Sequence, residues 1–263
     1  IQTVNHAAGD WTETDLANYQ IKVREELSSQ YHDYQITTTP PPSAGGIALI
    51  TMLNILEHTD LTHISPLNYV HHITESMRLA YWQRAAFLAD PEFMTMPINS
   101  LISKDNAEDL YLMIDGKKAL QSQSLTEHTI ETNESSNTTH FSIIDKQGNI
   151  VSATLSLNSY FGSRIVANNT GILLNNQLAD FNLSGKAPNH AEPGKKPLSS
   201  MTPTIIENKD KLAILGTPGG YRIPNILLLN ILSFTQNNHP QAWVNKPRFH
   251  HGYFPDEIQY ERG

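Results

Sequence analysis

The distribution of apolar residues changes once along this chain, at a polar segment that spans residues 117–137. Before this segment, apolar residues recur with helical spacing or fill whole stretches, as at 47–57. After it, short runs of alternating apolar and polar residues are separated by turn residues, which is typical of β-hairpins. Helices followed by hairpins predict an α+β fold built from packed layers of helix and sheet.

The part of the chain before the polar segment is predicted to be mostly helical. Strand-like alternation covers 21–39, whereas residues 47–57 are apolar on nearly every side and predict a helix buried all round. Ser65 is a good N-cap for a long helix, and a further helix is predicted at 102–114. The polar segment 117–137 is predicted to be an exposed, flexible connector, and such connectors are open to cleavage.

The first predicted hairpin brings hydroxyl groups together. Its strands are expected at 141–144 and 150–157, on either side of a turn at 145–149. Pairing about this turn places Thr138 within a residue of Ser156, which lies on the polar face of the second strand. An ordinary solvent-facing strand has the same pattern, so the residues alone leave both interpretations open.

A glycine-rich segment follows a second predicted hairpin. The strands at 202–207 and 211–215 lead into 216–220, which ends in two glycines before an apolar helix. Free N–H groups at such a helix start suit an anion or a developing oxyanion, although a plain strand-to-helix turn has the same signature. The paired hydroxyls in 198–203 could bind a carboxylate or simply form a turn.

Composition excludes several classes of protein. A net charge of -8 without any run of Lys or Arg argues against nucleic acid or an anionic membrane and favours a small-molecule partner. No stretch approaches the roughly 18 apolar residues of a membrane span. The chain has no Cys, and the most closely spaced of its 12 His are adjacent pairs, whose side chains do not face a common point. We therefore expect no metal or cofactor. Because the chain opens at Ile1, we expect a processed terminus or a trimmed fragment.

Six ordered blocks together resemble the gamma-glutamyltranspeptidase family of N-terminal-nucleophile hydrolases. They are PPPSAGG at 40–46, TTHFS at 138–142, GILLNNQ at 171–177, KPLSSM at 196–201, PGG at 218–220 and PRFHH at 247–251. The resemblance covers essentially the whole chain. It implies a four-layer αββα sandwich and a precursor that cuts itself before Thr138. Residues 1–137 would be the C-terminal part of the large subunit, residues 138–263 the small subunit, and the two together one αββα domain.

The resemblance also implies a role for individual residues. Cleavage of the Asn137–Thr138 bond would free an α-amine that acts as general base for the Thr138 hydroxyl, the nucleophile. The implied catalytic set is Thr138, Ser156, Gly219 and Gly220, in which the glycines supply oxyanion N–H groups. The implied substrate-binding set is Asn158, Gln177 and Asp180 for the α-amino group, with Ser199 and Ser200 for the α-carboxylate.

The sequence departs from the family pattern at several of these positions. Ser156 replaces a Thr, Ala179 replaces the first Asp of a pair, and Tyr221 is bulkier than the residue expected after the glycines. The link at 181–198 is shorter than in members that carry a lid, which predicts a more open site. The family's carboxylate-binding Arg lies in the absent first half of the large subunit.

The implied activity is hydrolysis of glutathione-like γ-glutamyl amides, or transfer of the γ-glutamyl group to an amino acid or peptide. A related self-cleaving acylase or poly-γ-glutamate transferase is the alternative, and an inactive fragment that serves as a binding module is the third possibility. The resemblance implies a periplasmic or extracellular location.

Overall fold

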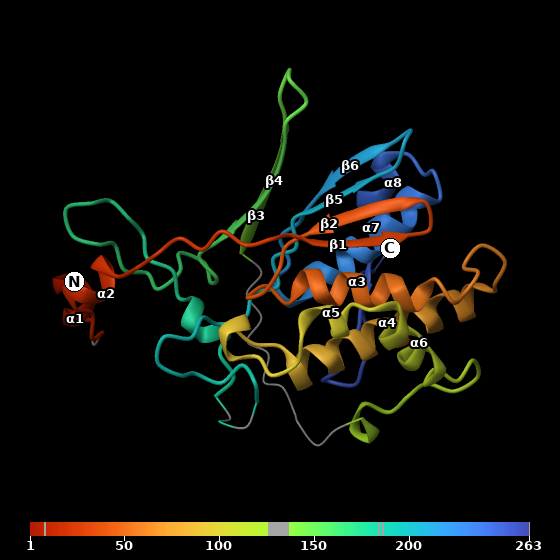
Figure 1. The fold of residues 1–263 in the computed structure, drawn as a ribbon, viewed down its shortest axis with the longest axis horizontal. Helices are drawn as coiled ribbons and strands as arrows, with labels where there is room; N and C mark the ends of the chain where they lie inside the picture. Colours follow the sequence, from red (N-terminus) through yellow and green to blue (C-terminus); the bar gives the residue numbers. More distant parts are fainter. Residues whose placement is uncertain (8, 126–136, 184, 186, 263) are drawn as a thin grey trace.

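The computed structural model describes residues 1–7, 9–125, 137–183, 185 and 187–262 (Figure 1). The α-helices are α1 Gln2–His6, α2 Glu13–Ala17, α3 Gly45–Leu56, α4 Pro66–Phe87, α5 Ile98–Leu101, α6 Lys104–Leu112, α7 Ile223–Thr235 and α8 Pro240–Asn245. The 3-10 turns are η1 Pro91–Phe93, η2 Ser122–Ser124, η3 Gln177–Asp180 and η4 Gly220–Arg222. The strands are β1 Leu27–Tyr31, β2 Tyr34–Thr38, β3 Thr138–Ile144, β4 Ile150–Ser156, β5 Thr204–Glu207, β6 Leu212–Leu215, β7 Phe249–His250 and β8 Gln259–Tyr260.

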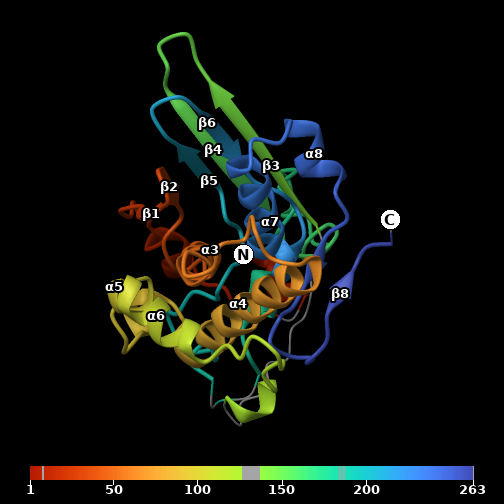
Figure 2. The ribbon, with the colours of Figure 1, turned by 90° about the vertical axis from the view of Figure 1, so that its right-hand side faces the viewer.

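Helix α3 is the centre of the core. Every one of its residues is buried, as its continuous apolar sequence predicts. It packs between helices α4 and α7 and an antiparallel sheet of strand order β1-β2-β5-β6 (Figure 2). The predicted mixture of helix and sheet is therefore confirmed. Among the residues that the structure describes, no helix has both the length and the apolar character needed to cross a bilayer.

Two predicted elements have different bounds in the structure. The alternation at 21–39 forms the hairpin β1–β2, whose tight turn has His32 in the left-handed region at φ 52°. The helix predicted at 102–114 begins at Lys104, because the Ser103 side chain caps it by accepting the Asn106 N–H at 3.1 Å. A separate short helix, α5, precedes this cap.

The described part of the connector is exposed at most of its residues, as predicted, and Ser122 is the exception. Ser122 is fully buried, and its N–H donates to the Asp256 carboxylate at 2.8 Å. Its hydroxyl accepts from the buried Arg78 guanidinium at 2.6 Å, so the connector is anchored at this one residue. The composition of the segment gave no sign of this arginine, which lies on α4. Residues 126–136 of the predicted connector lie outside the described residues.

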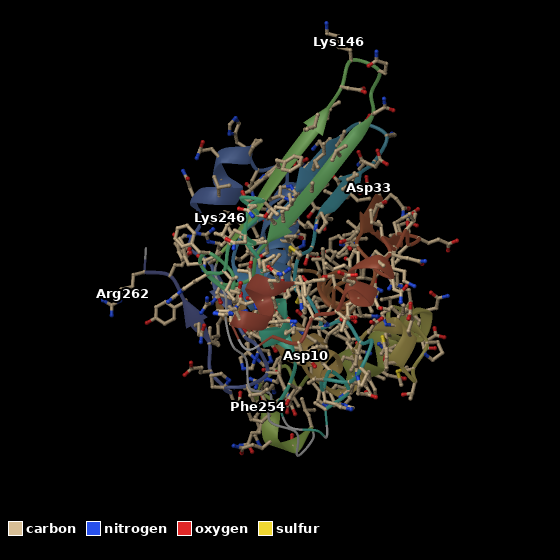
Figure 3. The ribbon with its side chains drawn as sticks, turned by 90° about the vertical axis from the view of Figure 1, so that its left-hand side faces the viewer. Asp10, Asp33, Lys146, Lys246, Phe254 and Arg262 are labelled. Atoms are coloured by element: carbon tan, nitrogen blue, oxygen red, sulfur yellow. The ribbon has the colours of Figure 1, made fainter. Side chains whose placement is uncertain are left out.

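The hairpin β3–β4 extends away from the body of the molecule, with Lys146 at its tip (Figures 1 and 3). Its inner face approaches the end of β6, where Ser152 Oγ donates to the Leu215 carbonyl at 3.3 Å. Its outer face carries large apolar side chains that are about half exposed, namely Phe141, Ile143, Val151 and Leu155. In the described chain, β3 and β4 pair only with each other.

Candidate active site

The register of the hairpin places two hydroxyl groups at the start of β3. Thr138 lies directly opposite Ser156, as the alternation predicts to within one residue. Thr138 Oγ1 donates to Ser156 Oγ at 3.3 Å, and Ser156 Oγ donates to the Asn137 carbonyl at 3.0 Å. The Asn158 N–H donates to Ser156 Oγ at 2.9 Å. Ser156 thus uses its one hydrogen on the carbonyl of the bond before Thr138 and accepts from two donors.

Asp180 lies at the end of η3, against Asn158. Asn158 Nδ2 donates to Asp180 Oδ1 at 3.0 Å, and the buried Asn158 holds this orientation with a left-handed backbone, φ 71°. Burial raises the pKa of the Asp180 carboxyl to about 6, although the Arg84 charge and the Asn158 hydrogen bond both favour its ionised form. The group therefore titrates near pH 6, and it lines the same cavity as Thr138.

The glycine segment after β6 is held close to the hairpin. A Cβ on Gly216 would lie 1.9 Å from His140 Nδ1, so only glycine fits beside this imidazole. The ring is fixed in turn by hydrogen-bond contacts with Thr154 at 2.8 Å and Ser142 at 3.0 Å.

Gly219 and Gly220 adopt positive φ values of 140° and 56°. Across the described residues, neither glycine donates its N–H to another group. Both N–H groups are therefore available to an oxygen of a ligand.

The two serines at 199–200 are positioned by the segment before α3. Ser199 exchanges backbone hydrogen bonds with this segment, since its N–H donates to Pro42 and its carbonyl accepts from Ala44, both at 2.9 Å. A Cβ on Gly45 would lie 2.0 Å from Thr202 Oγ1 and 2.8 Å from the Ser200 carbonyl. The glycine of the PPPSAGG block is therefore needed for close packing against the serine segment, a requirement that the motif alone did not show.

One cavity contains most of the predicted site residues. Its lining includes Thr138, Ser156, Asn158, Gln177, Asp180, Ser199, Ser200 and Gly220. Gly219 and Asn137 are outside the lining, but each is the chain neighbour of a lining residue. The lining also contains Arg84, Asn182 and Asn189, which the sequence motifs did not indicate. Nothing in their local pattern sets them apart, because they come together only when α4 and the loop after η3 pack.

The histidines of the PRFHH block are buried supports. Burial lowers the pKa of His250 to about 3 and that of His251 to about 4, so both are neutral near pH 7. Asn225 Nδ2 donates to His250 Nδ1 at 2.7 Å, and the contact of His251 with Asp256 at 3.2 Å is a hydrogen bond of a neutral ring. Within the described ranges, no three His, Asp or Glu side chains are grouped as metal ligands.

The fold of the described chain is similar to that of a solved acylase. The cephalosporin acylase from Bacillus halodurans superposes with a TM-score of 0.75 and 24% sequence identity over 94% of this chain and 44% of that one. The family model described as gamma-glutamyltranspeptidase matches residues 1–263, and the chain belongs to this family.

Two curated relatives illustrate the range of the family. The glutathione hydrolase proenzyme of Escherichia coli (strain K12) is 37% identical over 100% of this chain and 48% of its own length. The acylase ACY 1 proenzyme of Pseudomonas sp. (strain SE83) is 35% identical over 90% of this chain and 42% of its own length. The chain spans about half the length of the curated relatives that it matches.

Proposed function

We propose that the complete protein is a γ-glutamyl hydrolase or transferase that uses Thr138 as its nucleophile after cleavage of the Asn137–Thr138 bond. The observation that carries the proposal is the chain of hydrogen bonds from Thr138 Oγ1 through Ser156 Oγ to the Asn137 carbonyl oxygen. A nucleophilic hydroxyl is thereby linked to the carbonyl that it would attack. The other polar groups of the cavity surround this pair.

Self-cleavage follows from this geometry by an N-to-O acyl shift. Thr138 Oγ1 adds to the Asn137 carbonyl carbon, and the Ser156 hydroxyl stabilises the negative charge that develops on the carbonyl oxygen. The hydroxyl proton passes to the Thr138 nitrogen as the C–N bond breaks, which leaves a free amine and an ester between the Asn137 carbonyl carbon and the Thr138 oxygen. Water hydrolyses this ester and restores the Thr138 hydroxyl. One product then ends with the Asn137 carboxylate, and the other begins with the Thr138 amine.

Turnover uses the amine that cleavage releases. The amine accepts the proton of the Thr138 hydroxyl as the oxygen attacks the γ-carbonyl of the substrate. The free N–H groups of Gly219 and Gly220 stabilise the oxyanion, and the leaving amine takes the proton. The γ-glutamyl ester is then hydrolysed by water or transferred to the amino group of an amino acid or peptide.

Charge complementarity supports the choice of a γ-glutamyl substrate. Asp180 offers a carboxylate to the substrate ammonium, with Asn158 and Gln177 in the same wall. Ser199 and Ser200 line the same cavity, and their hydroxyls would bind the α-carboxylate. A γ-glutamyl group carries both charges at its α-carbon, whereas a simple acyl group carries neither.

The architecture of the complete protein is part of the proposal. Residues 1–137 belong to a large subunit and residues 138–263 form the small subunit, both from one precursor, in a four-layer αββα domain. The half-exposed outer face of β3–β4 supports this arrangement, because an isolated two-stranded hairpin with an apolar face is marginally stable in water. A periplasmic or extracellular location completes the proposal and rests on the family alone.

The acylase alternative is favoured by one observation. Ala179 provides a methyl group in the cavity wall beside Asp180, where the family pattern has a second carboxylate. A site with one carboxylate fewer is less selective for an ammonium group, and a relative 35% identical to this chain is named an acylase.

A denaturing gel with intact-mass measurement on the complete protein tests the proposal directly. The wild type is expected to give two fragments whose masses identify the cut at Asn137–Thr138, and Thr138→Ala is expected to stay in one piece. Two fragments of unchanged mass from Thr138→Ala would remove Thr138 from the mechanism. If both proteins stayed intact, the third possibility of a binding module would take its place.

A further inference from the structure

Arg84 of α4 lies beneath the residue that follows the two glycines. Its guanidinium carbon is 4.3 Å from the centre of the Tyr221 ring and 5.9 Å from that of Tyr81. A guanidinium over an aromatic face at this distance is attracted by the ring, the more so where water is excluded. Tyr221 is buried, and its hydroxyl donates to the Gly252 carbonyl at 3.0 Å. Arg84 therefore helps to fix Tyr221.

Arg84 also belongs to the lining of the cavity. Arg84 and Asp180 both line it, and the positive charge of Arg84 favours the ionised form of this carboxylate. Arg84 Nη1 is buried and makes no hydrogen bond with any described residue. The charge of Arg84 acts through space on Asp180, whose pKa it lowers against the effect of burial.

We propose that Arg84 is a positioning residue that couples the two ends of the site. It holds Tyr221 beside Gly219 and Gly220, and it keeps a positive charge near the Asp180 carboxylate. The inference rests on the proposed function, and it adds a residue that neither the motifs nor their spacing indicated. Tyr221 is bulkier than the family pattern predicts, and its stacking with Arg84 gives that substitution a role.

The two effects of Arg84 predict different kinetic changes. Burial raises the pKa of Asp180 and the charge of Arg84 lowers it, so loss of this charge raises the pKa further. A smaller fraction of the carboxylate is then ionised and able to bind the substrate ammonium. Loss of the planar guanidinium releases Tyr221 and therefore disturbs the adjacent oxyanion glycines. The first change affects KM and its pH dependence, and the second affects kcat.

The experiment compares Arg84→Gln and Arg84→Lys in the complete protein, with a γ-glutamyl anilide and the glutaryl anilide that lacks the ammonium group. For Arg84→Gln, the acid limb of kcat/KM for the γ-glutamyl substrate is expected to move up by about one pH unit, which lowers kcat/KM about tenfold on the acid side. Arg84→Lys keeps the charge and is expected to keep the wild-type limb. The glutaryl profile is expected to stay in place for both variants.

Arg248→Gln is the matched control, because Arg248 pairs with Glu261 outside the catalytic cavity and its substitution also removes one positive charge. Circular dichroism checks that each variant is folded. An acid limb of folded Arg84→Gln within about 0.2 pH unit of the wild type would overturn the charge coupling. A wild type with no γ-glutamyl activity would instead contradict the proposed function.

A double-mutant cycle tests the stacking. Tyr221→Leu keeps an apolar side chain but removes the ring, and kcat is expected to fall about tenfold in either single variant. Arg84→Gln made in the Tyr221→Leu background is expected to lower kcat by no more than about twofold further, because the shared contact is already lost. Full additivity of the two effects on kcat would overturn the proposed hold on Tyr221.

Discussion

Ser156 is the residue on which both proposed reactions depend. Its hydroxyl bridges Thr138 Oγ1 and the Asn137 carbonyl, so Ser156→Ala removes the donor to the oxygen that becomes negatively charged during self-cleavage. We expect precursor cleavage to slow roughly 100- to 1000-fold, the usual effect of losing one oxyanion donor. Ser156→Thr keeps the hydroxyl in a strand position that suits Thr, and we expect it to mature.

The measurement is a time course of precursor cleavage for the wild type and both Ser156 variants. Circular dichroism controls for folding, which we expect to be intact because Ser156→Ala removes one oxygen atom and opens no apolar core. Maturation of folded Ser156→Ala at the wild-type rate would mean that Ser156 is only a strand residue.

Asp180 is expected to set the pH dependence of substrate binding. Its pKa is raised to about 6 by burial, so the carboxyl becomes protonated as the pH falls through that value and no longer attracts the substrate ammonium. The KM for a γ-glutamyl substrate is expected to rise below about pH 6, while the KM for a glutaryl substrate changes little.

Asp180→Asn supplies the control. It is expected to abolish this pH dependence and to reduce selectivity for γ-glutamyl over glutaryl roughly 10- to 150-fold, the equivalent of a charged hydrogen bond. Selectivity unchanged within about twofold would favour the acylase alternative.

At the scale of elements, the contact between the hairpin and the glycine segment sets the position of the oxyanion donors. A Cβ on Gly216 would overlap the His140 ring, which hydroxyls hold on both sides. Gly216→Ala is expected to lower stability by about 1–3 kcal/mol and to reduce kcat as the segment shifts. Thermal denaturation and steady-state kinetics measure the two effects.

The double variant His140→Ala with Gly216→Ala checks the cause. Removing the ring makes room for the added methyl group, so the Gly216→Ala substitution is expected to cost little in that background. An equal loss of stability in both backgrounds would trace the effect to the backbone of the segment rather than to the overlap.

The elements show what the sequence could and could not predict. The register of β3–β4 was predictable, because alternation and the turn at 145–149 together fix which residues face each other. The turn of β1–β2 was not, since the left-handed His32 has a contact from a distant segment, the hydrogen bond that its N–H donates to the Glu57 carboxylate at 2.8 Å. Arg84 could not be found from its pattern, because its neighbours Asp180 and Tyr221 arrive from distant segments.

At the scale of the whole molecule, a four-layer domain and a free hairpin predict different surroundings for the outer face of β3–β4. Phe141, Ile143, Val151 and Leu155 lie on this face and are 45–52% exposed in the described chain. In a four-layer αββα domain, a helical layer would cover the face and the strand edges would be paired. The exposed apolar surface would then be part of a core.

The substitution Ile143→Asn in the complete protein tests whether this face is covered. If a helical layer packs on it, the polar amide is buried without a partner and an apolar side chain is lost, which is expected to cost about 2–4 kcal/mol. If the hairpin stands free, the cost is expected to stay within about 0.5 kcal/mol, as for other surface sites. Leu67→Asn is the matched control, because Leu67 is 78% exposed in the first turn of α4. Denaturant unfolding of the wild type and both variants measures the difference, and equal small losses for Ile143 and Leu67 would contradict the four-layer proposal.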